Sequence, residues 1–131
     1  MVKYILFVCT ENSARSQMAE GFFNFYNKNP GYVGISAGTQ PAKSIKPYAI
    51  EVMKEKGIDL AKQKPKIITW SMAQKAYKIY TMGCIQGCPI TPPEKTEDWN
   101  LEDPGERSIE KFREIRDAIE ERINKLISDF H

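Results

Sequence analysis

The chain has 131 residues, of which 41% are hydrophobic and 27% charged, and its formal net charge at pH 7 is only +2. This balance, with basic and acidic residues mixed along the sequence, argues against a nucleic acid or an anionic membrane as partner. The length suits one core, so we expect residues 1–131 to form a single domain.

The first predicted strand is the apolar run YILFV at residues 4–8. Because both faces of this run are apolar, it suits a central strand of a parallel sheet. It is too short to span a membrane, and it leads at once into Cys9 and a polar loop, without the cleavage site of a signal peptide. We therefore expect a cytoplasmic protein.

A first helix is predicted to start near Ser13, because apolar residues then recur every three or four positions. The turn KNPG at 28–31 ends it. YVGISAG at 32–38 predicts a second strand. A second helix is predicted over 45–56, where Gly57 stops it.

In the second half of the chain, residues 66–70 fit either a short strand or the entry into a helix. Residues 75–82 predict a strand that runs into a loop rich in glycine and proline. A brief strand is predicted near Asp98 and Trp99. The last helix is predicted from an apolar stripe formed by Ile109, Phe112, Ile115, Ile119, Ile123, Leu126 and Phe130.

Strands that alternate with helices predict an α/β fold: a three-layer α/β/α arrangement around a small, parallel, four-stranded central sheet. Ligands of such sheets bind beyond the carboxyl ends of the strands. The loop after Cys9, the segment MGC at 82–84 and the loop that contains Asp103 each follow a strand or a possible strand. These three segments are therefore expected to meet at one edge.

Cys9 and Arg15 stand at the two ends of the loop between the first strand and the first helix. Backbone N–H groups in such a loop point inward and bind oxyanions, and the helix N-terminus adds positive potential that also favours the thiolate form of Cys9. Arg15 adds a planar fork for two oxygens. The expected oxyanion-binding residues are Thr10, Glu11, Asn12, Ser13, Ala14, Arg15 and Ser16. The alternative is a buried cysteine before an ordinary helix, since C-x5-R alone is a weak signal.

The segment VCTENSARSQMAE at 8–20 resembles the active-site loop of the low-molecular-weight tyrosine phosphatase family, most of all its thioredoxin-coupled arsenate reductase branch. The resemblance covers almost the whole chain and extends through ISAGT, AIEVMKEKGIDL, TMGC, CPITPP, DWNLEDP and the last helix. It implies the fold of that family and an enzyme that reduces arsenate to arsenite.

The resemblance also implies roles for individual residues. Asp103 protonates the departing oxygen, although on sequence alone a turn-forming aspartate before proline is the more ordinary interpretation. Cys9 attacks arsenic, Cys84 then attacks the sulfur of Cys9 and releases arsenite, and Cys88 attacks Cys84. A thioredoxin-like protein reduces the resulting Cys84–Cys88 bond, and no bound cofactor is expected.

Cys84 and Cys88 lie four positions apart. On a regular helix this spacing leaves the Cβ atoms roughly 5–6 Å apart, whereas a disulfide needs about 3.5–4.5 Å. Oxidation of the pair therefore requires a loop or a distorted turn, which the neighbouring glycines and proline permit, and we infer a mobile redox segment. A zinc site would need two further ligands, and the chain offers only Cys9 and His131. Two incidental loop thiols are the other alternative.

Some relatives bind potassium beside the loop, and the matching side chains here include Asn12, Glu20 and Ser36. The remaining carboxylate of that site is replaced near Lys66. A lysine opposes a bound cation and can substitute for its charge, so we predict no required metal.

Two other functions stay open. A phosphatase for tyrosine or small aryl phosphates would use Cys9, Arg15 and Asp103 with the other two thiols as bystanders. The segment GERS at 105–108 lacks the aromatic residues that phosphatases of this fold place beside a phosphotyrosine ring. A binding domain that senses oxyanions or redox state would keep its affinity after Cys9→Ser. The sequence does not identify the reductant, and the resemblance implies a monomer.

Overall fold

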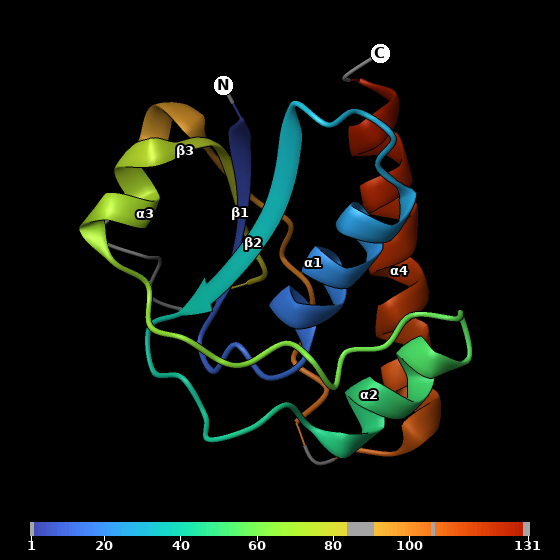
Figure 1. The fold of residues 1–131 in the computed structure, drawn as a ribbon. Helices are drawn as coiled ribbons and strands as arrows, with labels where there is room; N and C mark the ends of the chain where they lie inside the picture. Colours follow the sequence, from blue (N-terminus) through green and yellow to red (C-terminus); the bar gives the residue numbers. More distant parts are fainter. Residues whose placement is uncertain (1, 84–90, 106, 130–131) are drawn as a thin grey trace.

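The computed structural model describes residues 2–83, 91–105 and 107–129 (Figure 1). The elements follow in the order β1 (Lys3–Cys9), α1 (Arg15–Tyr26), β2 (Tyr32–Gly38), α2 (Pro47–Lys54), α3 (Trp70–Lys75), β3 (Ala76–Thr81), the 3-10 helix η1 (Pro93–Lys95), β4 (Thr96–Asp98) and α4 (Ile109–Ser128). Within the described ranges, no helix combines the length and the apolar character needed to cross a membrane.

The strands form one parallel sheet of four strands in the order β2-β1-β3-β4. The predicted α/β class and the parallel four-stranded sheet are therefore confirmed. β1 is central, and its residues from Ile5 to Cys9 are all buried, as expected for a strand that is covered on both faces. Its carboxyl end delivers Cys9 to the edge of the sheet.

Helices cover the two faces of the sheet unequally (Figure 1). α1 and α4 pack against each other on one face, α2 packs on α4, and α3 lies on the opposite face. Successive residues of β1 face different cores: Phe7 belongs to the larger core with Phe23 and Phe112, while Leu6 and Val8 belong to the smaller core beside α3. The layers of the predicted arrangement are thus present, with one short helix on the second face.

The first helix begins later than predicted. It starts at Arg15 instead of near Ser13, because the two residues on either side of Ser13 have non-helical backbones. Asn12 has φ 50, in the left-handed region, and Ala14 has φ −143 and ψ −81. The loop needs this conformation, so the periodicity of the helix extends further than the helix itself.

The second helix is shorter than the predicted span of 45–56. Pro47 occupies its first turn, where a missing N–H costs nothing. Gly57 stops the helical segment as predicted: its φ is 79, and the N–H of Ile58 donates to Met53 O at 3.0 Å.

Residues 66–70 contain a single strand-like bridge and the entry into a helix, the two structures that the sequence left open. Ile67 forms an isolated parallel bridge with Gly38, and α3 then begins at Trp70. Thr69 caps this helix, since its Oγ1 accepts the N–H of Met72 at 3.1 Å.

The stripe predicted on the last helix is confirmed. Its inward residues are buried in the larger core, with Ile109 partly buried at the start, while Phe130 lies outside the described residues; the buried members are Phe112, Ile115, Ile119, Ile123 and Leu126. Ser108 caps the helix, because its Oγ accepts the N–H of Lys111 at 3.4 Å.

Ion pairs at Glu55 hold the end of α2 against α4. Glu55 Oε2 accepts from Arg113 Nη2 at 2.7 Å, and Glu55 Oε1 accepts from Arg116 Nη1 at 2.6 Å. The hydrogen bonds from Arg113 and then Arg116 lower the pKa of Glu55 from 4.5 to about 2. Because the folded pKa is lower than the unfolded one, these bonds stabilise the fold above pH 4.5 and are lost as the pH falls towards 2.

We predict that Glu55→Gln lowers the melting temperature at pH 7, and that the difference from the wild type shrinks as the pH falls from about 4.5 to about 2. Thermal unfolding followed by circular dichroism across this range measures the effect. Glu121→Gln, an exposed change on α4, serves as the matched control. A difference that is constant with pH would contradict the role given to the ion pairs.

Candidate active site

The loop 10–14 joins β1 to α1 at the carboxyl edge of the sheet. Cys9 is only 3% exposed, and its Sγ lies 2.9 Å from Ser16 Oγ, within hydrogen-bonding distance. The backbone N–H of Asn12 donates to the same sulfur at 3.2 Å. The sulfur therefore lies against polar hydrogens and the first turn of a helix, where negative charge is stabilised.

The carbonyl groups of this loop point away from the sulfur. Thr10 O, Glu11 O and Ser13 O each accept a backbone N–H from the segment 40–46, at distances of 2.8–2.9 Å. With the carbonyls turned outward, loop N–H groups are free to face a bound anion. The exposed Glu11 side chain lies 3.8 Å from Lys46 Nζ, so its carboxylate points to the surface.

Asn12 holds the loop in its turn. Its φ of 50 lies in the left-handed region, which asparagine adopts more readily than most residues. Its side chain is fully buried: Oδ1 accepts from Gln17 Nε2 at 2.9 Å and from the backbone N–H of Lys66 at 3.0 Å, and Nδ2 donates to Ser16 Oγ at 2.6 Å. One amide thus connects the loop to α1 and to the chain that enters α3.

We predict that Asn12→Ala destabilises the protein by about 3 kcal/mol, because buried donors lose their acceptor and the left-handed backbone is strained. Asn12→Gly loses the same hydrogen bonds but relieves the backbone, so it should be less destabilising by about 1 kcal/mol. The free energies of unfolding in urea of the two variants measure the cost of the lost hydrogen bonds and of the backbone strain. Equal stability of the two would show that no strain is stored at this residue.

Arg15 joins three loops at this edge. It is 5% exposed, and its Nη1 donates to the carbonyl oxygens of Met82 and Leu101, the latter at 3.0 Å. Its Nη2 lies 3.7 Å from Asp103 Oδ2. The structure therefore brings Cys9, Arg15 and Asp103 together with the chain that follows β3 and β4. Cys84 and Cys88, to which the family resemblance also gives catalytic roles, lie outside the described residues.

The cradle between these side chains is small. It has a volume of about 10 Å³ and is lined by Cys9, Glu11, Ser13, Ala14, Arg15 and Asp103. This is about the space of one water molecule. A tetrahedral anion needs more room, so its entry requires the 60% exposed Asp103 side chain to move away from Arg15.

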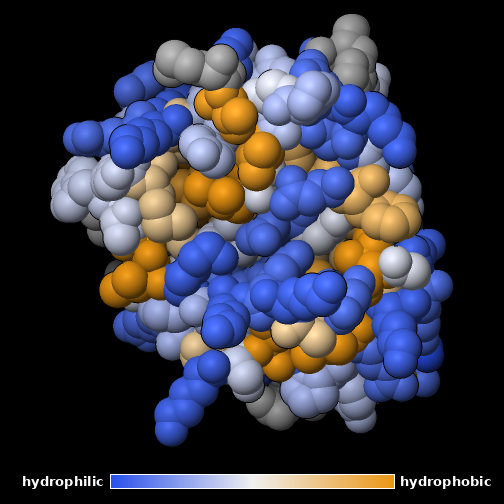
Figure 2. All heavy atoms as spheres, viewed as in Figure 1, coloured by the Kyte–Doolittle hydropathy of each residue, from blue (hydrophilic) through white to orange (hydrophobic). Residues whose placement is uncertain are grey.

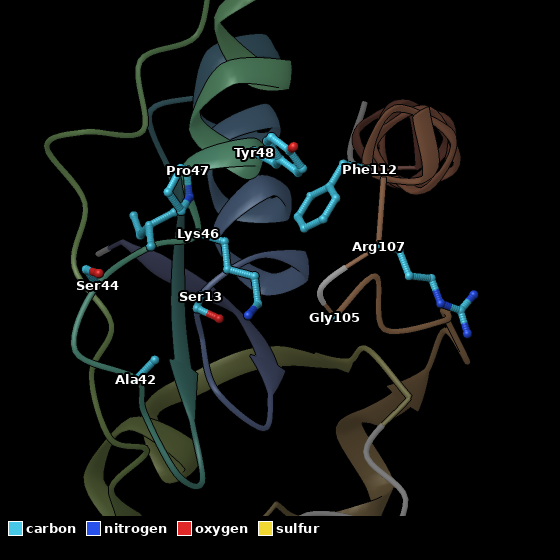
Figure 3. Close-up of a pocket in the computed structure, with 10 residues that line it drawn as sticks. Ser13, Ala42, Ser44, Lys46, Pro47, Tyr48, Gly105, Arg107 and Phe112 are labelled. Atoms are coloured by element: carbon cyan, nitrogen blue, oxygen red, sulfur yellow. The ribbon is translucent and has the colours of Figure 1, made fainter. Parts of the chain in front are cut away.

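A larger cavity of about 470 Å³ opens beside the loop at Ser13 (Figure 3). The rings of Tyr48 and Phe112 line it side by side and meet edge-on, with centroids 5.5 Å apart. Lys46 lines the same space. This cavity far exceeds an oxyanion in size and has room for an organic group.

A second polar cluster lies beneath the loop. Ser36 Oγ donates to Glu20 Oε1 at 2.6 Å, and Lys66 Nζ lies 3.8 Å from the same oxygen. Lys66 thus pairs with Glu20. Across the described ranges, no three histidine, cysteine, aspartate or glutamate side chains are grouped to hold a metal.

Three further residues of this region were not identified from the sequence. Gln17 is fully buried and bridges the loop to residue 64, where its Nε2 donates to the backbone oxygen at 3.0 Å. A Cβ atom on Gly38 would lie 2.6 Å from Thr10 O, so only glycine fits beside the loop. Asp98 Oδ1 accepts the backbone N–H of Gly83, which follows β3, at 2.8 Å. Only Gly38 carried a signal, as the glycine that closes a predicted strand.

A buried thiol beside an arginine and a loop of inward N–H groups, at a strand–helix junction, defines an enzyme that attacks oxyanions through sulfur. Comparison with known sequences agrees with this class. The chain belongs to the low molecular weight phosphotyrosine protein phosphatase family, whose sequence profile matches residues 4–131.

Within the family, the chain is similar to arsenate reductases. It is 37% identical to the glutaredoxin arsenate reductase of Synechocystis sp., over 97% of this chain and 98% of the relative. A solved arsenate reductase in the phosphate-binding state matches with a TM-score of 0.82 and 36% identity, over 99% of this chain and all of the other. A thioredoxin-dependent arsenate reductase of Corynebacterium glutamicum has a TM-score of 0.82 and 34% identity, over 98% of this chain and 61% of its own.

Proposed function

We propose that this protein reduces arsenate to arsenite, with Cys9 as the nucleophile. The observation that carries the proposal is the meeting of Cys9, Arg15 and Asp103 around one cradle, in a chain similar to arsenate reductases along nearly its whole length. The protein is an enzyme of the phosphatase-fold family, and thiol chemistry is what this cradle supports.

In the first step, arsenate enters between Arg15 and Asp103 and replaces their contact of 3.7 Å. Arg15 and the loop N–H groups hold its oxygens, and the sulfur of Cys9 forms a bond to arsenic. Asp103, which also lines the cradle, gives a proton to the departing oxygen, which leaves as water. Ser16, 2.9 Å from the sulfur, stabilises Cys9 before the attack.

The reduction follows by thiol exchange. Cys84 attacks the sulfur of Cys9, so that an S–S bond forms, the S–As bond breaks, and its electron pair stays on arsenic, which leaves as arsenite. Cys88 then attacks Cys84, which frees Cys9 and leaves a Cys84–Cys88 disulfide. Both later cysteines lie outside the described residues, so this relay rests on the sequence and on the relatives.

An external thiol donor must reduce the last disulfide. Relatives are named for glutaredoxin and for thioredoxin, and we propose a thioredoxin-like donor with glutaredoxin as the alternative. We further propose a single-domain, monomeric, cytoplasmic enzyme without a bound cofactor or a required metal.

The decisive experiment mixes the fully reduced protein with arsenate in the absence of any external reductant. We expect about one arsenite per chain, because the protein holds the electrons for one turnover. Mass spectrometry should then find a Cys84–Cys88 disulfide. Cys9→Ser should release no arsenite and should still be stabilised by phosphate in a thermal-shift assay. Intact thiols and no arsenite from the wild type would contradict the proposal.

One observation favours a second activity, the hydrolysis of aryl phosphates. The cavity of about 470 Å³ shares Ser13 with the cradle and is lined by the Tyr48 and Phe112 rings, apolar surfaces of the kind that pack against the organic group of a phosphate ester. Hydrolysis of p-nitrophenyl phosphate tests this activity. Phosphatase turnover needs only Cys9, Arg15 and Asp103, so it should persist in Cys84→Ser, whereas arsenite release should not.

A further inference from the structure

The backbone that leads into Cys84 is held by a side chain that has no place in the reaction described above. Gly83, the residue before Cys84, donates its N–H to Asp98 Oδ1 at 2.8 Å. Thr81 Oγ1 donates to the same oxygen, also at 2.8 Å. Asp98 is the last residue of β4, and β4 is an edge strand. One carboxylate oxygen therefore fixes the exit of the chain from β3.

Met82, one residue earlier, is held independently of Asp98. Its N–H donates to Val8 O at 2.8 Å, and its carbonyl accepts from Arg15 Nη1. Its side chain is fully buried in the larger core. Loss of Asp98 would therefore leave Met82, and the guanidinium that contacts it, in place. Gly83 is the residue that would be released.

Only glycine fits at residue 83. Its φ is 90, in the region that favours glycine, and a Cβ atom there would lie 2.7 Å from Leu101 O. Glycine is the most flexible residue when nothing holds it. At this position, the hydrogen bond to Asp98 holds the backbone of Gly83 in place.

We propose that Asp98 is a positioning residue that aims the chain at Gly83 so that Cys84 reaches the sulfur of Cys9. The proposal rests on the relay given under the proposed function. A thiol tethered at a fixed point and angle has a higher effective concentration at its target than one on a swivelling tether. Removal of the Asp98 carboxylate should thus slow the formation of the Cys9–Cys84 bond, while oxyanion binding at the Cys9 loop is unchanged.

The test isolates that bond in a Cys88→Ser background, where the relay stops at Cys9–Cys84. Formation of this disulfide is triggered in two ways. Arsenate starts it by the proposed reaction. Hydrogen peroxide starts it without arsenic: the Cys9 thiolate takes one oxygen to form a sulfenic acid, and the Cys84 thiolate then displaces hydroxide to form the disulfide. Quenched-flow alkylation and mass spectrometry give the rate of disulfide formation in each case.

Asp98→Ala should slow the bond by about tenfold with either trigger, because it removes a charged acceptor shared by two donors. Asp98→Asn keeps an Oδ1 acceptor and should restore the rate to within about twofold of the wild type. Glu97→Ala is the matched control, since it removes an exposed carboxylate one residue earlier on the same strand. Protection of Cys9 by phosphate against iodoacetamide should be the same in all of these variants.

Each result bears on the proposal. Wild-type rates in Asp98→Ala, an equal loss in Glu97→Ala, or no rescue by Asp98→Asn would overturn it, as would the failure of peroxide to produce a Cys9–Cys84 bond. A bond that forms with peroxide at a rate dependent on Asp98, but not with arsenate, would sustain the positioning role and contradict arsenate as the substrate.

Discussion

Arg15→Lys should lower kcat/KM for arsenate by about a thousandfold, because an ammonium group cannot replace the planar fork of a guanidinium. Arg15 donates to Met82 O and Leu101 O through one nitrogen, while its second terminal nitrogen faces the cradle 3.7 Å from Asp103. Lysine has a single nitrogen. A lysine at this position could therefore bind either the two carbonyl groups or an oxyanion, but not both at once.

Steady-state arsenite formation with an excess of thiol donor measures this loss. Phosphate protection of Cys9 against alkylation should fall in parallel, which separates lost binding from misfolding. Arg107→Lys is the control, since Arg107 is an exposed arginine that lines the larger cavity and not the cradle. An Arg15→Lys enzyme that keeps more than about a tenth of the wild-type kcat/KM would mean that the oxyanion is held chiefly by the loop N–H groups.

Asp103→Asn should lower the rate of the first chemical step by about a hundredfold, because an amide cannot protonate the departing oxygen. Binding should respond in the opposite sense. In the unliganded protein the Asp103 carboxylate lies 3.7 Å from Arg15 and competes with an incoming anion. With this negative charge removed, phosphate and arsenate should bind as tightly as in the wild type, or more tightly.

Single-turnover arsenite release gives the rate, and isothermal titration with phosphate gives the affinity. Glu102→Gln, which neutralises the neighbouring carboxylate of the same loop, should alter neither by more than about twofold, because Glu102 pairs with Arg107 and Lys111 away from the cradle. Weaker phosphate binding in Asp103→Asn, or an unchanged rate, would remove Asp103 from the role of proton donor.

Much of the fold could be predicted because the spacing of apolar residues indicates which face of each element is buried. The run at 4–8 and the stripe on the last helix correspond to β1 and α4, since each has the period of the element it forms. The start of the first helix could not be placed in this way. It depends on the backbone of Asn12 and Ala14, which the loop dictates and which hydrophobic periodicity does not report.

The candidate site was predictable only where its chemistry is local. Cys9 and Arg15 are six positions apart on one loop, so the sequence displays them together. Asp98 and Gln17 act through partners 15 and 47 positions away, respectively, and no spacing rule connects such residues before the sheet is built. The identification of Asp103 needed the resemblance to a family, because an aspartate before proline is otherwise an ordinary turn.

The folded chain carries its own positive charge beneath the loop, since Lys66 is paired with Glu20. A dissolved ion that filled this place would come and go, and its occupancy would follow its concentration in the medium. A side chain cannot be diluted or exchanged. We therefore expect arsenite release to proceed at the same rate in potassium, sodium or choline chloride of equal ionic strength. The loop would then be supported equally well whichever monovalent cation is present.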